Sequence, residues 1–528
     1  MALYFSGGTI WRQSGSYAKS IRVNDGVIVE IDGPPQSDDQ LIDLKGSFLS
    51  PAFMDGHAHP LFAGRESQGP SVNGLHSIKE IVAEVKRFAD SNPNVSWIIG
   101  GAYEAAIIDR GDFLADWLDE VVSDRPVILH AADHHTIWVN SKALELAGIT
   151  SATADPDGGT IARNDDGKPR GTLREPSAIN LVLQHAPVRT IEEDVQAINW
   201  ACDQYLASGV TSAVDAWVEP GMAEAYIAAS KSGLLTIDMN LCFLAQPEKW
   251  RENIEYFASL RKDIESLGSD SKLHAKTVKM IGDGALSAGT AALLQPYLDD
   301  PSTSGLLIWN DEEMREAALH FDSQGYQLHI HGIGDAAVRQ ALDVIEYVIE
   351  NNPEWDRRPV IVHAQLVDPV DMPRFADLGV IANFQPLWTY LDPMNKELIA
   401  PRLGEERNNR QYQLASMVKS GAQISYGSDW PVTSYLPLLA LAVPTHRMSP
   451  TEDSAPWSPE ESISIEESLS FYTASVAHQL FDEERTGKIE VGMAADLMIL
   501  ERNPLSEDPR KVAKISVLAT YKLGVKVF

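Results

Sequence analysis

Short apolar stretches alternate with helical segments along most of the chain, and this alternation constrains the fold more than any other feature. Each apolar stretch is followed by a polar loop, and helix-like segments such as SIKEIVAEVKRFAD lie between the stretches. The expected strands are one within GSFLSPAFMDGHAHP (46–60), VILHA (127–131), TSAVDA (211–216), TVKMIG (277–282), YQLHIHG (326–332), VIVHAQ (360–365), VIANFQ (380–385) and QISYGSD (423–429). About eight strand–helix units predict an α/β fold, a (β/α)8 barrel of the TIM type, rather than a doubly wound sheet.

The two ends of the chain have a different texture. Residues 1–50 and 485–528 carry β-branched runs interrupted by glycine-rich turns, and we expect them to form one composite β-sandwich because chain termini often lie close together. The barrel then occupies residues 51–484. Two segments exceed a minimal barrel: an insertion at 65–125, and a stretch at 150–175 whose Gly, Asp and Pro content predicts a hairpin or lid.

Composition limits the classes of partner. The chain has 528 residues, of which 44% are hydrophobic, so it can bury a large core. It carries 43 basic and 75 acidic residues, a formal net charge of −32. Such a surface repels phosphate backbones and anionic membranes, so we expect a small-molecule substrate and neither a nucleic-acid nor a membrane partner.

Cysteine usage and the N-terminus bear on the compartment. Cys202 and Cys242 are the only two cysteines, which excludes a disulfide framework and fits a reducing compartment. The first residues lack a basic segment followed by an apolar one, and the apolar stretch at 436–444 contains Pro437 and is too short to span a bilayer. We therefore expect a cytoplasmic protein, with a homodimer as the commonest default for its oligomeric state.

A pair of histidines follows the first expected barrel strand. His57 and His59 come directly after Asp55-Gly56, and residues two apart on a strand share a face. Both imidazoles can therefore reach one metal ion from a single backbone segment. Alone, this HxH spacing is weak evidence, because two unrelated surface histidines give the same pattern.

Three further candidates lie at the ends of separate expected strands. His331 ends YQLHIHG, His363 ends VIVHA and Asp429 ends ISYGSD. In a barrel these carboxyl ends of the strands form the active-site face. Each histidine alone is explained equally well by burial in a hydrogen-bonded core, but several at strand ends indicate a centre for zinc, iron or manganese.

A lysine in the fourth expected barrel strand is a further candidate. Lys279 in TVKMIG is costly inside a barrel unless it is paired or used. A neutral lysine amine can add CO2 and become a carbamate, an anionic oxygen ligand that can bridge two metal ions. Lys276, three positions away, faces the opposite side of the strand, and spacing alone does not decide which of the two points inward.

Together these motifs resemble the amidohydrolase superfamily, and within it amidohydrolase family 3, the YtcJ-like branch that includes N-substituted formamide deformylases. The resemblance spans almost the whole chain in order and rests on SPAFMDGHAHP, DHHTIWVNSKAL, VKMIGDGALSAGTAALLQPY, LHIHGIGDAAV, VIVHAQLV, YGSDWPV and GKIEVGMAADLMIL. It implies a metal-bearing (β/α)8 barrel with a β-sandwich built from both termini.

The resemblance also implies roles for individual residues. It favours Lys279 over Lys276, and His135 over His134 as a substrate-facing histidine, although His135 is equally explained as a loop hydrogen-bonding residue. Glu175 matches a position that is often acidic, and Trp430 either walls the pocket or packs in the core. The implied metal ligands are His57, His59, Lys279, His331, His363 and Asp429.

The implied reaction is hydrolysis of carbon–nitrogen bonds other than peptide bonds, such as amides, formamides and cyclic amides. A divalent metal, zinc before iron or manganese, activates water at a centre of one or two ions, and Lys279 is the candidate for carboxylation. Asp429 takes the proton of that water and passes it to the leaving nitrogen, while His135 helps to polarise the carbonyl.

Other readings stay open from the sequence. A phosphoester or lactone hydrolase on the same barrel needs cationic groups for an anionic substrate, and Arg163, Arg170 and Arg174 are available. A deaminase needs a glutamate near the fifth strand, and no HxxE occurs there. A non-catalytic binding protein that retains the fold is the third alternative.

Overall fold

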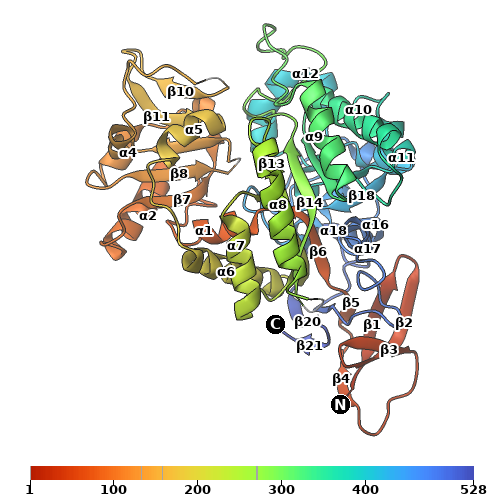
Figure 1. Cartoon of the computed structure of the whole chain (residues 1–528). Coiled ribbons are helices and arrows are strands. Elements are labelled where there is room, and N and C mark those ends of the chain that lie inside the picture. Colours follow the sequence, from red (N-terminus) through yellow and green to blue (C-terminus); the bar gives the residue numbers. More distant parts are fainter. Residues whose placement is uncertain (1, 133, 157, 269–270) are drawn as a thin grey trace. The chain divides into compact units, whose positions relative to one another are not determined.

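The computed structural model describes residues 2–132, 134–156, 158–268 and 271–528 (Figure 1). These residues form two compact units. The first, which we call the barrel unit, comprises residues 1–59, 202–430 and 434–528. The second, which we call the insertion unit, comprises residues 60–201 and 431–433.

The barrel unit contains a sheet of eight parallel strands in the order β18-β17-β16-β15-β14-β13-β12-β6. The bounds are β6 Phe53–Ala58, β12 Val210–Val218, β13 Asp238–Ala245, β14 Leu273–Ile281, β15 Gln327–Gly332, β16 Val360–His363, β17 Ile381–Phe384 and β18 Gln423–Tyr426. The backbone N–H of Asp429 donates to the carbonyl of His57 at 2.8 Å, and that of His59 donates to Trp430 at 2.7 Å. These bonds join the two edge strands, so the predicted (β/α)8 barrel is confirmed.

One expected barrel strand was wrong. VILHA forms β8 (Val127–Ala131), which pairs with β7 (Ile98–Tyr103) and β9 (Thr136–Val139) in the insertion unit. The missing barrel strand is β13, whose eight residues are all buried. Because strands buried on both faces are continuous apolar runs, the apolar pattern of VILHA does not tell which sheet it joins.

Helices follow the barrel strands and pack on the outside of the sheet (Figure 1). Helix α9 begins with an ordinary N-cap: the side chain of Asn310 accepts from the backbone N–H of Glu313, and the first turn is acidic. No described helix is long and apolar enough to cross a membrane. The main outer helices are α7 Met222–Ser232, α8 Trp250–Glu265, α9 Asp311–Ser323, α10 Asp335–Asn351, α11 Met372–Asp377, α13 Leu414–Lys419, α16 Ile465–Phe471 and α17 Ala474–Gln479.

The two ends of the chain share one sheet, as predicted. Strand β19 pairs antiparallel with β5, and the strand order is β21-β20-β19-β5-β1-β2-β3, with β4 beside β1. Phe5, Ile21, Leu49 and Leu497 are buried in a common apolar core. The bounds are β1 Leu3–Gln13, β2 Ser16–Asn24, β3 Val27–Ile31, β4 Gln40–Asp43, β5 Phe48–Pro51, β19 Leu497–Leu500, β20 Val517–Lys522 and β21 Val525–Lys526.

The insertion unit has its own five-stranded sheet in the order β10-β11-β9-β8-β7. The antiparallel pair β10 (Thr160–Arg163) and β11 (Pro169–Arg174) forms a hairpin within the segment 150–175, of which Asp157 lies outside the described residues. The helices of this unit include α1 Pro60–Glu66, α2 Ile78–Ser91, α3 Ala115–Asp119, α4 Ser141–Leu146 and α5 Glu175–Leu183.

Candidate metal centre

The barrel topology brings the strand-end candidates to one edge of the sheet. His57 lies on β6, Lys279 on β14, His331 on β15 and His363 on β16, while Asp429 follows β18. All five are at or near the carboxyl ends of parallel strands, which is the catalytic face of such barrels. Residues that are up to 372 positions apart in the chain, from His57 to Asp429 (429 − 57), therefore meet in space.

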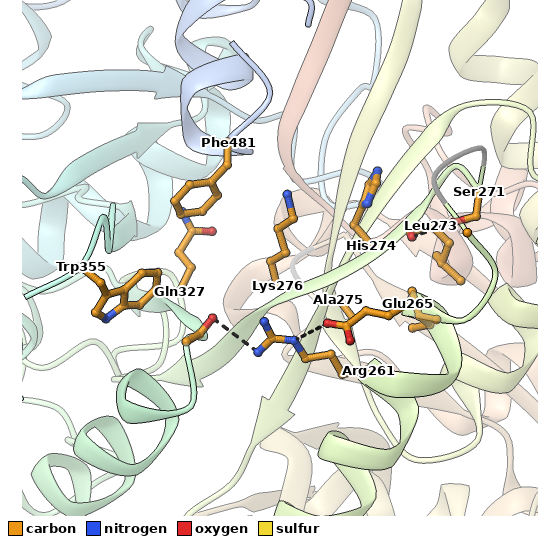
Figure 2. Close-up of a pocket in the computed structure, with 13 residues that line it drawn as sticks. Arg261, Glu265, Ser271, Leu273, His274, Ala275, Lys276, Gln327, Trp355 and Phe481 are labelled. Carbon is orange, nitrogen blue, oxygen red and sulfur yellow. Dashed lines mark hydrogen bonds and ion pairs between the residues drawn. The ribbon is translucent and has the colours of Figure 1, made fainter. Parts of the chain in front are cut away.

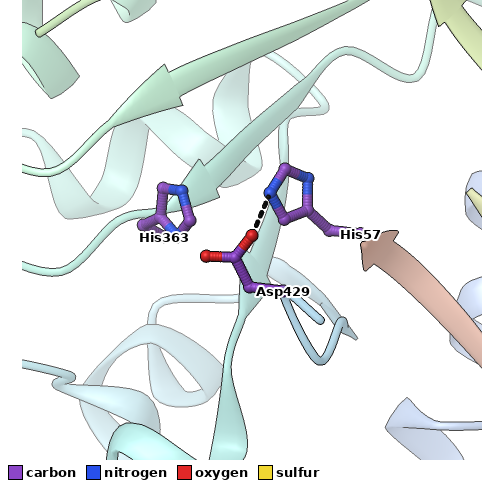
Figure 3. Close-up of side chains that lie close together, drawn as sticks. All are labelled: His57, His363 and Asp429. Atoms are coloured by element: carbon purple, nitrogen blue, oxygen red, sulfur yellow. Dashed lines mark ion pairs between the residues drawn. The ribbon is translucent and has the colours of Figure 1, made fainter. Parts of the chain in front are cut away.

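His57, His363 and Asp429 form the tightest group (Figure 3). One nitrogen or oxygen atom of each lies within 4.8 Å of the corresponding atoms of the other two. Nε2 of His57 is 3.3 Å and Nε2 of His59 is 3.1 Å from Oδ1 of Asp429. The rings of His331 and His363 meet edge to face with centroids 4.8 Å apart, so His331 adjoins the group.

Lys279 points into the barrel and Lys276 does not. The Lys279 side chain is 1% exposed, whereas Lys276 is exposed on the opposite face of β14. Burial lowers the pKa of Lys279 to about 8, against the opposing charges of Asp429 and Cys242. Burial is the main cause of the lowered pKa of His57 and of His363, and the positive charge of Lys279 lowers both further.

The protonation states at this centre are those that bind cations. Burial lowers the pKa of His363 to about 3 and that of His57 well below its usual value, so both imidazoles are neutral at pH 7. Burial alone raises the pKa of Asp429, but the neighbouring imidazoles of His57 and His59 outweigh burial and hold the pKa well below its usual value. Neutral imidazoles and an ionised carboxylate are the forms that metals bind.

The residues present fit a divalent metal ion. Among the described residues, Nε2 of buried His57 makes no hydrogen bond of normal geometry and faces Oδ1 of Asp429 at 3.3 Å, while its Nδ1 is engaged by His329 at 2.9 Å. A buried nitrogen lone pair of this kind is costly unless a ligand uses it. Imidazoles together with a carboxylate suit zinc, iron or manganese.

The backbone is bent into unusual conformations at the centre. His363 has a φ of 75° and Asp429 a φ of 57°, both in the left-handed region that non-glycine residues rarely adopt. Such conformations persist where the surrounding fold enforces them, and they cluster at functional sites. The two positive φ angles change the direction of the chain at His363, at the end of β16, and at Asp429, just after β18.

A close approach of two strands explains the glycine in the YGSD motif. A Cβ atom on Gly427 would lie 2.6 Å from the Cβ and 2.7 Å from the backbone N of His57. Neither atom can move without displacing β6, so only glycine lets the end of β18 reach His57.

We expect Gly427→Ala to destabilise the protein by about 1–3 kcal/mol and to lower its metal content, because the added methyl group pushes His57 aside. Thermal unfolding and elemental analysis would measure both effects. Gly332→Ala is the matched control, since its Cβ would meet side-chain methyl groups at 3.3 and 3.4 Å and backbone no closer than 3.6 Å. Equal behaviour of the two variants would contradict the close-approach argument.

The sequence-predicted substrate residues His135 and Glu175 lie in the insertion unit and contact each other. Nδ1 of His135 is 2.9 Å from Oε2 of Glu175. The neighbouring His134 faces a different carboxylate, with its Nε2 3.2 Å from Oε1 of Glu66. The two adjacent histidines point to different partners, although the segment is bent rather than extended here and His134 has a φ of 56°.

Aromatic rings surround the centre within the barrel unit. Trp388 stacks on His363 with centroids 5.4 Å apart and planes 7° apart, and Trp217 meets His59 edge-on at 6.4 Å. Trp430, predicted as either a pocket wall or a packing residue, is 6% exposed and packs against the rings of Tyr205 and Tyr435. These contacts are those of a side chain that packs against its neighbours.

Three residues in contact with the candidate ligands were missed from the sequence. His329 contacts His57, Asp283 has Oδ1 3.0 Å from Nδ1 of His331, and Gln385 has Oε1 2.7 Å from Nδ1 of His363. For His329 a signal existed, because it stands two residues before His331 just as His57 stands before His59. Nothing in the local sequence marked the other two.

A cavity of about 450 Å3 shares no residue with this centre (Figure 2). It lies beside β14 and α8, where Lys276, His274 and Arg261 line it together with the rings of Trp355 and Phe481. Lys276 holds its ammonium group 5.7 Å from the centroid of the Phe481 ring. This cavity is therefore separate from the candidate metal centre.

The fold and the clustered side chains define an α/β-barrel protein with a candidate metal centre at the catalytic end of its strands. Residues 40–528 match the Amidohydrolase family, and the chain belongs to that family.

Similar proteins match this chain over nearly its full length. The YtcJ protein of Bacillus subtilis (strain 168) is 28% identical over 547 residues, covering 100% of this chain and 99% of that protein. The N-substituted formamide deformylase of Arthrobacter pascens is 27% identical over 516 residues, covering 95% and 92%. An uncharacterized metal-dependent hydrolase from Pyrococcus furiosus has a crystal structure with a TM-score of 0.74 and 25% identity, covering 96% of this chain and 100% of that one. Together with the family, these similarities support hydrolase activity and a divalent metal.

Proposed function

We propose that this protein hydrolyses carbon–nitrogen bonds other than peptide bonds, in amides, formamides or cyclic amides, with water activated by a divalent metal. The observation that carries the proposal is the buried group of His57, His363 and Asp429 at the carboxyl end of the barrel. The similarity to an N-substituted formamide deformylase supports the choice of bond.

The proposed metal is zinc, held by His57, His59, His331, His363 and Asp429, with Lys279 as a further ligand. When bound, a divalent ion lowers the pKa of water from about 15.7 toward about 7 and polarises the scissile carbonyl. Iron and manganese accept the same donors.

Lys279 is proposed to carry a carbamate. Its lowered pKa makes the neutral amine available near pH 8. The ammonium group first loses one proton to solvent. The amine nitrogen then attacks CO2, a carbon–nitrogen bond forms as one C=O electron pair moves onto oxygen, and a second proton leaves to solvent, so that a cation becomes an anionic oxygen ligand overall. That change removes a positive charge that opposes cation binding among the histidines, and an anionic bridge would allow two metal ions instead of one.

Asp429 is proposed as the proton carrier. A carboxylate beside the attacking water takes its proton and later delivers that proton to the leaving nitrogen. The low pKa of Asp429 keeps it ionised at neutral pH. His135 and Glu175 are proposed, from the family resemblance, to contact the substrate, with His135 polarising its carbonyl.

The proposed partner is a small-molecule substrate, and the proposed location is the cytoplasm, which rests on the sparse cysteines. A homodimer is the proposed assembly, as the commonest arrangement among soluble oligomers.

We expect purified protein to contain about one or two divalent ions per chain and to hydrolyse at least one member of a panel of N-substituted formamides, amides and lactams. Removal of the metal with a chelator should abolish the activity, and Zn2+ should restore it. Phosphomonoesters and lactones belong in the same panel. Faster turnover of those esters would favour the phosphoester or lactone hydrolase, and bound metal with no turnover of any substrate would favour a binding protein.

A further inference from the structure

We propose that His329 is a positioning residue for the metal centre. Its Nε2 accepts a hydrogen bond from Nδ1 of His57 and so fixes the form of His57 in which Nε2 is free for the metal. This inference rests on the proposed function, because it requires His57 to bind a metal ion. It concerns a histidine that touches a ligand without belonging to the ligand set.

His329 is held in one place by the barrel. It lies on β15 with its backbone in register with Lys279 on β14 and Val360 on β16. Its side chain is fully buried, and its ring lies nearly parallel to that of His57, with an angle of 11° between the planes. The 2.9 Å separation of His57 Nδ1 and His329 Nε2 is a hydrogen-bond distance.

The proton on that bond determines the chemistry of His57. A neutral imidazole carries one proton, on either Nδ1 or Nε2. If Nδ1 of His57 donates to His329, then Nε2 of His57 is bare and presents a lone pair to the metal. The opposite arrangement, with His329 donating, would place the proton of neutral His57 on Nε2 and block the metal.

The other two strand-end histidines also have a polar side chain beside Nδ1. Nδ1 of His363 faces Oε1 of Gln385, whose amide nitrogen is used by Asn383 at 3.2 Å, so the Gln385 oxygen must accept and His363 must donate. His363 is thus directed to leave Nε2 free. Nδ1 of His331 lies 3.0 Å from Oδ1 of Asp283, a close contact without the geometry of a hydrogen bond. Partners of this kind orient metal-binding histidines generally, and His329 would do the same for His57.

A purely structural role explains His329 poorly. In the proposed form its proton is on Nδ1, and among the described residues that buried atom has no hydrogen-bonding partner. A buried donor without an acceptor is unfavourable for folding. An apolar residue would therefore suit the stability of the barrel better than histidine, and the only hydrogen bond of the His329 ring is to a candidate ligand.

The test measures metal affinity rather than activity. Zn2+ dissociation constants would be determined by competition with a fluorescent chelator for the wild-type protein and for His329→Leu, His329→Gln and His274→Leu. We expect His329→Leu to bind Zn2+ about 10- to 100-fold more weakly, as for losses of similar partners. The melting temperature of the metal-free protein should stay the same or rise. His329→Gln should recover most of the affinity, because its Oε1 can accept from Nδ1 of His57.

His274→Leu is the matched control, a largely buried histidine on the neighbouring strand that lines the outer cavity, and it should leave the affinity unchanged. The inference is overturned if His329→Leu binds Zn2+ within about twofold of wild type, or if His329→Gln binds no better than His329→Leu. Wild-type protein that binds Zn2+ but cleaves no carbon–nitrogen bond would refute the proposed function and still test the inference. Wild-type protein that binds no metal would refute both.

Discussion

Replacement of Asp429 by asparagine is expected to lower kcat by about 100- to 10,000-fold, the range that a positioned proton carrier contributes, while most of the metal stays bound. Asparagine keeps an oxygen that can face Nε2 of His57 and His59, which lie 3.3 and 3.1 Å from Oδ1 of Asp429. It cannot take a proton from water. Turnover of the best substrate and metal content per chain would be measured together.

The backbone should tolerate this change. Asp429 has a φ of 57°, and asparagine adopts the left-handed region more readily than most residues. The bond from its backbone N–H to the carbonyl of His57 at 2.8 Å does not involve the side chain. The loss of activity can therefore be attributed to the carboxylate.

Asp335→Asn is a suitable control for Asp429→Asn. Asp335 is a buried carboxylate that follows another barrel strand, and its Oδ1 accepts only from the backbone of Leu294 at 2.8 Å. That variant should keep nearly full turnover. Near-normal turnover of Asp429→Asn would remove Asp429 from the proton path, and loss of all its metal would make it chiefly a ligand.

The barrel was predictable because its strands carry their own signal. Continuous apolar runs between polar loops mark strands that are buried on both faces, and seven of the eight expected strands lie in the barrel. VILHA failed because it is equally apolar and forms β8 in the sheet of the insertion unit. Only long-range pairing distinguishes the two sheets, and no local pattern records that pairing.

The grouping of the candidate ligands was predictable from the sequence, but their contacts with neighbouring side chains were not. Strand ends in a parallel barrel must share one edge, so His57, His363 and Asp429 could be grouped before their distances were known. The contacts of His329 and Asp283 with ligand nitrogens depend on which rotamer each imidazole adopts. That choice is made by packing between neighbouring strands, which a single sequence does not display.

Residue spacing could not decide between Lys276 and Lys279, and the burial of the two side chains in the structure does. The two lie on opposite faces of β14, and residue spacing alone predicts only that one of them points inward. Lys279 is 1% exposed and Lys276 is exposed, which identifies the inward residue. Variants of the two lysines can therefore be compared, with Lys276 as the control for Lys279.

We expect Lys279→Ala to lose several kcal/mol of transition-state stabilisation, about 1,000-fold in kcat/KM, because it removes the proposed anionic ligand. Added propionate should restore part of the activity by placing a carboxylate in the space left by the side chain. Added propylamine supplies an amine of similar size and should not. Activity at saturating zinc would be measured against the concentration of each additive.

Lys276→Ala should retain normal activity and respond to neither additive, since its side chain points to the outer cavity beside Phe481. Circular dichroism and thermal unfolding would show that both variants fold. Rescue of Lys279→Ala by propylamine in preference to propionate would mean that the lysine acts as an amine. In that case the carbamate, and with it the anionic bridge between two ions, would have to be abandoned, while a single ion held by the histidines and Asp429 would still be compatible with the result.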